Sequence, residues 1–373
     1  MAGKGDRIRI GFIGAGGIVR QRHVPGLRQI PGVEFVGVVN SSPESTARAA
    51  RELGIAREFD SPEALIGSDE IDVVWIGTQP YLHSQLATAA LEAGKHVFCQ
   101  ARMAMAYADA RKMYETWQRS DCTAMVCPPP HYMRGDRVVR RLLADGFVGQ
   151  PYNVTVRSYG DQYHDPSQPV HWRQIERISG LNTLDVGMLI EVVHRWLGYT
   201  RRVCARARTL LPVRPPAEVN QGKGQTNVER PDTLTVAAEM ENGALFSGLW
   251  SGVAKFADGT NAIEVFGSDG TIRYLAGTDA PGSGTILAAK VRETALREVP
   301  VLAGEARTWM VEADFVAAVR DGRRDPEPSF WDGLKYMEFT DAAFRSAGEG
   351  RAVDLPYEAS LRAAGRPAAG ATA

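Results

Sequence analysis

The strongest constraint on the fold lies in residues 8–40, where an apolar segment leads into a glycine-rich turn, a helical segment and a second apolar segment. Residues 8–13 are rich in apolar side chains, as a parallel strand buried on both faces requires. Gly14 permits a tight turn, and Gly16 lets the backbone approach a phosphate, because a side chain there would collide with it. The following helix offers N–H groups and the positive end of its dipole to an anion. This order predicts a unit that binds the pyrophosphate of a dinucleotide.

Asn40, at the end of the second apolar segment, departs from the usual pattern of such units. An Asp or Glu there commonly binds the ribose 2′-hydroxyl of NAD. Asn40 is uncharged and is followed by Ser41 and Ser42, so the strand end does not repel the 2′-phosphate of NADP. No Arg stands at the strand end itself, and Arg48 lies a helical turn or two further along. We therefore expect NAD or NADP as cofactor, with NAD favoured.

Composition and charge exclude several classes of protein. The 373 residues suffice for two domains, and 43 Lys plus Arg against 44 Asp plus Glu give no excess charge for nucleic acid or an anionic membrane. The cysteines lack metal-ligand spacing, so we expect reduced thiols, no metal and a cytoplasmic location. No apolar stretch of about twenty residues indicates a membrane span. The cysteines are Cys99, Cys122, Cys127 and Cys204.

Strand and helix signals alternate up to about residue 125. This alternation predicts a parallel, doubly wound sheet. The segments expected to be strands and helices are, in chain order, 45–53 (helix), 71–76 (strand), 84–93 (helix), 96–99 (strand), 107–119 (helix) and 123–127 (strand).

After residue 150 the pattern changes to strands with few helices between them. Asn242-Gly243 and Asp269-Gly270 are typical hairpin turns, so a mostly antiparallel sheet is expected. The expected strands are 152–157, 233–240, 245–249, 262–266 and 271–274, and the expected helices are 184–196, 305–320 and 331–347.

Several motifs occur along the chain in a fixed order and spacing. They are Gly14 to Gly17, residues 78–83 (Thr-Gln-Pro-Tyr-Leu-His), residues 91–97, His171-Trp172-Arg173, the helix with Asp185 and Gly187, and residues 264–271. Together they resemble the motifs of the Gfo/Idh/MocA family of NAD(P)-dependent oxidoreductases over residues 8 to about 356. Residues 78–83 are similar to the family's Thr-Pro-Asn-x-x-His segment.

The resemblance implies an α/β protein with an N-terminal Rossmann dinucleotide-binding domain, residues 1–127. A C-terminal α/β domain for substrate binding and oligomerisation follows, residues 128–356, with a large, mostly antiparallel open sheet and C-terminal helices able to pack back on the first domain. Residues 357–373 form a tail. The resemblance also implies a sugar or cyclitol substrate and a homodimer or homotetramer. The expected cofactor-binding residues are Gly14, Ala15, Gly16, Gly17, Ile18, Asn40, Ser41, Thr78, Gln79, His83, Gln100, Ala101, Trp172 and Arg173.

Two of the family's three proton-handling groups are replaced in this sequence. Gln100-Ala101-Arg102 stands where the family has Glu-Lys-Pro, so the Lys that assists proton transfer is Ala101. Asp185 is retained, whereas the His expected four residues later is Leu189. Oxidation of an alcohol needs a base near the hydroxyl, and the protein must supply it.

Three functions remain open on this pattern. The chain could be an oxidoreductase with an atypical active site, acting on a polyhydroxylated small molecule. It could be a redox-neutral lyase or glycoside hydrolase that uses transient oxidation by bound NAD. It could also be a non-catalytic nucleotide-binding partner subunit.

Candidate replacements for the missing groups lie in several segments. Asp185, Tyr163 and His164 are the candidate catalytic residues, although the loop around Tyr163 also fits an ordinary hydrated turn. Arg102 could bind an anionic group of the substrate or be a solvated surface residue. His131, after three prolines, and Asn182 are the other candidate substrate contacts, although for His131 a packing role at the domain interface is slightly favoured. His194 and His83 are expected to be structural, His83 in support of the cofactor loop.

Overall fold

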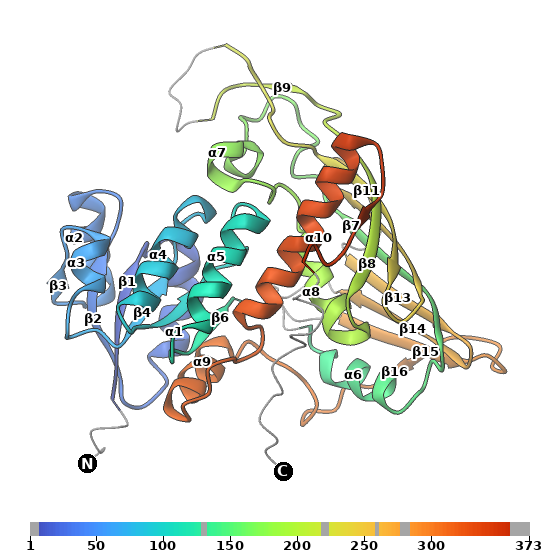
Figure 1. The fold of residues 1–373 in the computed structure, drawn as a ribbon, viewed down its shortest axis with the longest axis horizontal. Helices are drawn as coiled ribbons and strands as arrows, with labels where there is room; N and C mark the ends of the chain where they lie inside the picture. Colours follow the sequence, from blue (N-terminus) through green and yellow to red (C-terminus); the bar gives the residue numbers. More distant parts are fainter. Residues whose placement is uncertain (1–6, 128–132, 218–223, 258–260, 277–283, 359–373) are drawn as a thin grey trace. The chain divides into compact units, whose positions relative to one another are not determined.

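The computed structural model describes residues 7–127, 133–217, 224–257, 261–276 and 284–358. Contacts divide the chain into two compact units (Figure 1). Unit 1 contains residues 1–128 and 310–334, and unit 2 contains residues 129–309 and 335–373.

Unit 1 is built on a parallel sheet. Its strands are β1 (Ile8–Ile13), β2 (Val33–Val39), β3 (Arg57–Glu58), β4 (Val73–Ile76), β5 (His96–Cys99) and β6 (Ala124–Val126). They lie in the order β3-β2-β1-β4-β5-β6, and every neighbouring pair is parallel. The chain therefore moves outward in one direction from β1 to β3 and in the other from β4 to β6. This confirms the predicted doubly wound sheet, whose ligands bind at the carboxyl ends of the strands where the order reverses.

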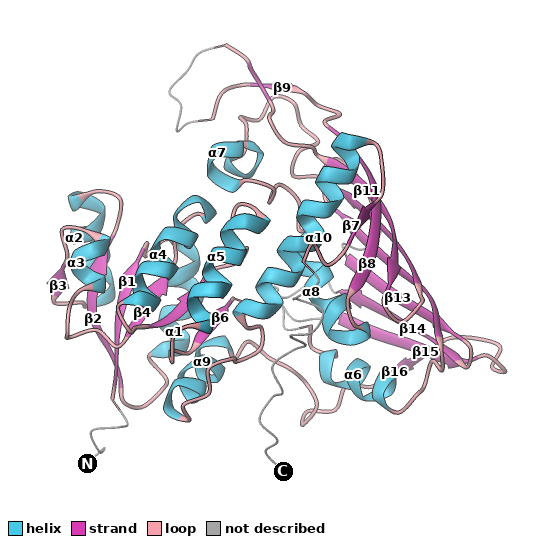
Figure 2. Ribbon diagram, in the orientation of Figure 1, coloured by secondary structure: helices cyan, strands magenta, loops and turns pink. Residues whose placement is uncertain are grey.

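Helices connect these strands, and Figure 2 shows the alternation. They are η1 (Val19–His23), α1 (Val24–Leu27), α2 (Pro43–Leu53), α3 (Pro62–Ile66), α4 (Pro80–Glu92) and α5 (Tyr107–Gln118). Helix α9 (Val311–Arg320), much later in the chain, also belongs to unit 1. Helix α4 begins at Pro80, four residues before the predicted start, because proline at the first helical position has a suitable φ and needs no N–H partner.

The predicted helix 305–320 was too long at its start, since α9 begins at Val311. The backbone N–H of Arg307 donates to the carbonyl oxygen of Arg134, at 2.9 Å, and so is held outside the helical pattern. Residues 310–334, including α9, belong to unit 1, where the N–H of Ala124 in β6 donates to the carbonyl of Arg324 at 3.0 Å.

Unit 2 is built on a nine-stranded sheet. Its strands are β7 (Pro151–Tyr159), β8 (Thr200–Arg208), β11 (Thr233–Met240), β12 (Leu245–Ser251), β13 (Asn261–Gly267), β14 (Gly270–Ala276), β15 (Gly284–Lys290), β16 (Arg297–Val299) and β17 (Val353–Asp354). The order is β16-β15-β14-β13-β7-β12-β11-β8-β17. Of these neighbours β7 and β12 are parallel, and the other pairs are antiparallel, as predicted.

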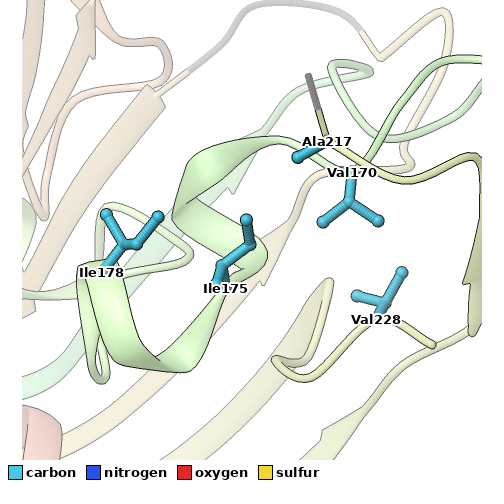
Figure 3. Packing of buried hydrophobic residues seen from close by; sticks show 5 residues of the cluster. All are labelled: Val170, Ile175, Ile178, Ala217 and Val228. Atoms are coloured by element: carbon cyan, nitrogen blue, oxygen red, sulfur yellow. The ribbon is translucent and has the colours of Figure 1, made fainter. Parts of the chain in front are cut away.

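Helices and a small apolar cluster complete unit 2. The helices are α6 (Asp136–Ala144), η2 (Trp172–Gln174), α7 (Glu176–Ser179), α8 (Val186–Leu197) and α10 (Phe330–Glu349), whose first turns lie in unit 1, and β9 (Val213–Arg214) pairs with β10 (Thr226–Asn227). Helices α8 and α10 approach closely at Gly187, where an added Cβ would lie 2.6 Å from the ring of Tyr336. The cluster in Figure 3 holds the segment around α7 and consists of Val170, Ile175, Ile178, Ala217 and Val228.

Among the described residues, none of the helices is long and apolar enough to cross a membrane. The four cysteines are free thiols, three of them buried.

Candidate functional site

The glycine turn after β1 has the shape that a pyrophosphate needs. Gly14 has φ +83°, and a Cβ there would lie 2.7 Å from Thr78 Cγ2 and 2.9 Å from the backbone nitrogen of Thr78. At Gly16 and Gly17, in contrast, an added Cβ would meet no atom of the described residues within 4 Å. Open space therefore lies over the start of the helix, where backbone N–H groups and the helix dipole favour an anion.

Asn40 joins this turn to the beginning of α2. Its Oδ1 accepts from the N–H of Ala15 at 2.7 Å, and its Nδ2 donates to the carbonyl of Ser45 at 3.0 Å. Arg20 supports the turn from the other side, because its Nε donates to the carbonyl of Ala15 at 2.8 Å. Arg20 also pairs with Glu52, at 2.6 Å. Arg20 carries no motif in the sequence, because its pairing depends on Glu52, a neighbour in space.

His83 ties together the segments that follow β4 and β5. Its Nδ1 lies 3.0 Å from the carbonyl oxygen of Arg102 and 3.2 Å from that of Met103, and its Nε2 lies 3.0 Å from that of Thr78. The side chain is fully buried, and this burial lowers the pKa of His83. The geometry agrees with the structural role expected for His83.

Gln100, Ala101 and Arg102 follow the end of β5 at the carboxyl edge of the sheet. Gln100 and Arg102 are each only 7% exposed. The alternative in which Arg102 is a solvated surface residue is therefore wrong. Ala101 is half-buried and carries only a methyl group.

Gln100 belongs to a buried polar chain that the sequence did not indicate. Its Nε2 contacts Nε2 of His23, and Nδ1 of His23 lies 2.5 Å from Oε1 of Glu312. His23 is 0% exposed and Glu312 is 2% exposed. Glu312 lies 289 positions from His23 in the sequence, so no local signal links the two.

In unit 2, Asp185 stands immediately before α8 and is half-buried. Its Oδ1 accepts a hydrogen bond of 2.7 Å from Oγ of Ser158 in β7. Leu189, which stands where the resembled family has His, is a buried apolar residue of α8. Among these positions Asp185 is the one that keeps a proton-accepting side chain.

Tyr163 and His164 make hydrogen bonds to the backbone. Tyr163 is 2% exposed, and its hydroxyl donates to the carbonyl of Thr183 at 3.0 Å. Nδ1 of the exposed His164 lies 3.1 Å from the carbonyl oxygen of Val253. The buried Arg214 fixes this loop by donating to the carbonyls of Tyr163 and, at 2.6 Å, Asp165.

Trp172 and Arg173 stack on one another, with the guanidinium carbon 4.4 Å from the ring centre. Asn182 is buried and its Nδ2 donates to the carbonyl of Ser179 at 2.7 Å. His194 is buried, which lowers its pKa to about 3, and its Nε2 lies 3.1 Å from Oγ1 of Thr200. It is neutral at physiological pH and structural, as expected. His131 lies outside the described residues.

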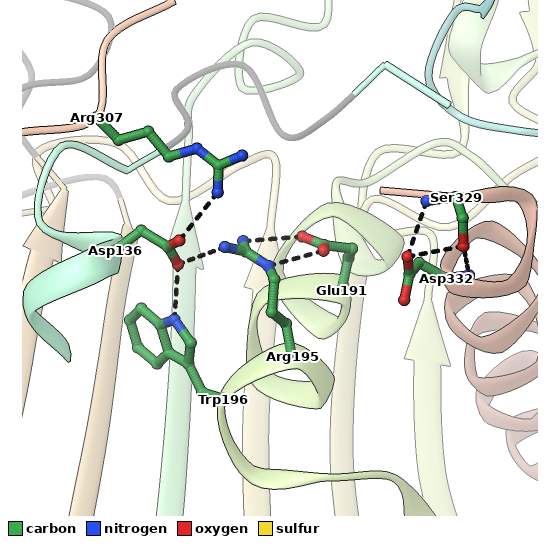
Figure 4. A network of polar contacts seen from close by, with 7 residues as sticks. All are labelled: Asp136, Glu191, Arg195, Trp196, Arg307, Ser329 and Asp332. Atoms are coloured by element: carbon green, nitrogen blue, oxygen red, sulfur yellow. Dashed lines mark hydrogen bonds and ion pairs between the residues drawn. The ribbon is translucent and has the colours of Figure 1, made fainter. Parts of the chain in front are cut away.

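A buried polar network holds α8, the helix that Asp185 precedes (Figure 4). Asp136 of α6 accepts from Nε1 of Trp196 at 2.8 Å, pairs with Arg195 and lies 3.3 Å from Nη1 of Arg307. Arg195 also pairs with Glu191, one helical turn earlier, at 2.9 Å. Two guanidinium groups thus balance two carboxylates, and the network fixes α8 against α6.

Comparisons with known proteins agree with this architecture. Residues 8–127 match the model of the Gfo/Idh/MocA oxidoreductase family's NAD-binding Rossmann fold, and residues 140–355 match the model of its C-terminal α/β domain. The levoglucosan dehydrogenase of Pseudarthrobacter phenanthrenivorans is 26% identical over 86% of this chain and 89% of its own length. The D-apiose dehydrogenase of Paraburkholderia graminis is 27% identical over 94% of this chain and 90% of its own length.

Solved structures of the same fold are also similar. A levoglucosan dehydrogenase in complex with NADH and levoglucosan has a TM-score of 0.81 and 25% identity, covering 94% of this chain and 99% of that one. An oxidoreductase domain protein from Kribbella flavida has a TM-score of 0.83 at 22% identity, with the same coverage, and shares the fold. With both domain models matched in order along the chain, this protein belongs to the Gfo/Idh/MocA family of oxidoreductases, with an NAD-binding Rossmann domain and a C-terminal α/β domain.

Proposed function

We propose that this protein oxidises a hydroxyl-bearing carbon of a sugar, cyclitol or related polyhydroxylated small molecule, or reduces the corresponding carbonyl. We further propose that NAD is the favoured cofactor and that the active site is atypical. Membership of a family of NAD(P)-dependent oxidoreductases supports the reaction class. The names of relatives support the substrate class, since they are dehydrogenases of levoglucosan, apiose and inositol.

The residues around the glycine turn fit a dinucleotide. The space beside Gly16 and Gly17 suits a pyrophosphate, and Gly14 keeps the turn tight enough to present the helix start. A bound nicotinamide cofactor would supply the hydride chemistry. The residues proposed to hold it remain those expected from the sequence, with Asn40 and Arg20 acting through the shape of the turn.

Asp185 is the proposed proton-transfer residue, and its hydrogen bond from Ser158 is the observation that carries the proposal. The serine hydroxyl fixes one carboxylate oxygen, so the orientation of the acid is set before a substrate binds. Ala101 cannot exchange a proton, nor can Leu189. The phenol of Tyr163 is buried and donates to a backbone carbonyl, which favours Asp185 over it.

Arg102 is proposed to contribute a fixed positive charge, because a guanidinium does not release its proton under physiological conditions. Arg102 is a candidate for contact with an anionic group of the substrate and not for general base catalysis. Asn182 and His131 stay predictions as further substrate contacts.

The test is a panel of sugars, anhydrosugars, cyclitols and sugar acids, each incubated with NAD or NADP. Formation of reduced cofactor and release of product are followed in the same reaction. The proposal expects a stoichiometric increase of reduced cofactor with at least one member of the panel. Product release without net cofactor reduction would instead indicate a redox-neutral lyase or hydrolase. Cofactor binding with no turnover of any substrate would favour a partner subunit.

A further inference from the structure

We propose that His23 and Glu312 are positioning residues that hold the Gln100 carboxamide with its oxygen available to the nicotinamide half of the cofactor. This inference rests on the proposed function, because it assumes that a dinucleotide binds at the carboxyl edge of the unit 1 sheet. The inference gives a role to the buried polar chain of Gln100, His23 and Glu312. None of the roles proposed above for the glycine turn or Asp185 involves this chain.

The three side chains form one continuous line of contacts. Glu312 of α9 meets Nδ1 of His23, at 2.5 Å, and Nε2 of His23 meets Nε2 of Gln100. All three are at least nine-tenths buried. Trp75 and Phe98 hold the His23 ring, with their ring centres 5.0 and 5.2 Å from it. The imidazole is thus confined between one acceptor and one amide.

The chemistry of the two ends sets the hydrogen-bond direction. A carboxylate only accepts, so Nδ1 of His23 carries the proton that it donates to Glu312. The amide nitrogen of Gln100 only donates, so Nε2 of His23 accepts from it. The amide oxygen of Gln100 then remains as the hydrogen-bond acceptor that this side chain presents. A neighbouring hydroxyl or amide N–H of a ligand can donate to that oxygen.

The position of Gln100 says which part of the cofactor it meets. Strand order reverses between β1 and β4, and the end of β2 is where an adenosine ribose is bound in such sheets. Gln100 follows β5, on the other side of this reversal. A dinucleotide laid across the reversal therefore places its nicotinamide half over the end of β5.

Glu312 also lies near Cys127, which follows β6. Burial raises the pKa of the Cys127 thiol, and the nearby Glu312 charge raises it further. Cys127 therefore stays a neutral thiol, so it places no second negative charge beside the Glu312 carboxylate.

The test measures binding of NADH and of ADP, which lacks the nicotinamide half, to the full-length protein. Glu312→Gln keeps the side-chain volume and removes the charge that orders the chain. We expect about fivefold weaker binding of NADH, because one hydrogen bond loses its fixed direction, and unchanged binding of ADP. Gln100→Met should give a similar loss, and Glu312→Gln should add no further loss in the Gln100→Met background.

A rescue variant sharpens this test. Gln100→Glu combined with Glu312→Gln keeps one carboxylate and one amide but exchanges their places. His23 would then donate from Nε2 to residue 100, whose carboxylate retains an oxygen for the cofactor. NADH binding should return to within about twofold of the wild type, as the partial restoration of one hydrogen bond implies.

Glu338→Gln is the matched control, since Glu338 is a buried glutamate of unit 2 paired with Lys335. It should lower the melting temperature without changing NADH affinity. Equal weakening of NADH and ADP in Glu312→Gln would overturn the inference, as would additive losses with Gln100→Met. If the wild type bound ADP and NADH equally, Gln100 would make no nicotinamide contact. If it bound neither NADH nor NADPH, the proposed function itself would fail.

Discussion

Ser158 donates a 2.7 Å hydrogen bond to Asp185, which joins strand β7 to the residue that precedes helix α8. Strand β7 lies between β12 and β13 inside the nine-stranded sheet, so the serine is held by a rigid support. The contact explains how a single retained acid can be oriented when the Lys and His expected beside it are absent.

Ser158→Ala should lower kcat about tenfold, because a hydrogen bond to a charged group contributes about 1.5 kcal/mol or more. Cofactor affinity should not change, since Ser158 is not among the proposed cofactor-binding residues and its hydrogen bond goes to Asp185. Steady-state rates measure the fall in kcat, and titration with NADH measures the cofactor affinity. Ser247→Ala, at an exposed position of the neighbouring strand β12, is the control and should leave both constants unchanged.

Gly16→Asp should weaken NADH binding by on the order of a hundredfold or more, because the new carboxylate would lie beside the pyrophosphate at a few ångströms. Isothermal titration of wild type and variant with NADH and NADPH measures this. Gly54→Asn, at the exposed end of α2 where φ is +62°, is the control, as Asn tolerates this conformation. A Gly16→Asp variant that binds as tightly as the wild type would place the nucleotide elsewhere.

Ala101→Lys, alone or with Leu189→His, should not raise dehydrogenase activity. The added ammonium would follow the end of β5 directly before the buried Arg102, where burial and like charge both lower the pKa of a lysine. At position 189 the new imidazole would replace a buried leucine. The rate of reduced-cofactor formation by both variants on the substrate panel tests this prediction. A strong gain of sugar oxidation in the double variant, with native activity intact, would mean that the site is a damaged form of the ordinary one.

Asp136→Ala should destabilise the protein by about 3–5 kcal/mol, since it leaves the buried network with two guanidinium groups and one carboxylate. Asp136 is 0% exposed and contacts Arg195, Arg307 and Trp196 (Figure 4). Urea unfolding followed by circular dichroism measures the loss. Glu115→Ala breaks an exposed pair with Arg111 and should cost less than about 1 kcal/mol. Similar losses in the two variants would show that the network does not stabilise α8.

The sequence predicted the parts of the fold that have strong local signals. Strands β1, β5 and β11 have the predicted bounds, because the apolar runs of β1 and β5 and the alternating pattern of β11 end at glycine or polar residues. Strand β8 was missed, since its buried face consists of Val203 and Ala205 between arginines and a cysteine. Such a short, small-residue alternation gives little periodic signal.

The candidate site was less predictable because its geometry depends on contacts between distant segments. Asp185 stood out through the resemblance, but its partner Ser158 lies 27 positions away on a strand. His23 meets Glu312 across 289 positions, and neither residue carries a local motif. The Tyr163 hydroxyl donates to a backbone carbonyl and is therefore less suited to catalysis. The sequence alone does not show which polar side chains are engaged with the backbone in this way.

The central claim is that Asp185 transfers the proton in an NAD(P)-dependent oxidation of a polyhydroxylated substrate. The most direct measurement compares the rate of reduced-cofactor formation by wild type and Asp185→Asn on the substrate that the panel identifies. Asn keeps the shape and removes the charge, so kcat should fall about a hundredfold or more while NADH affinity is unchanged. Equal turnover by the two proteins would contradict the claim and make Tyr163 and His164 the leading candidates.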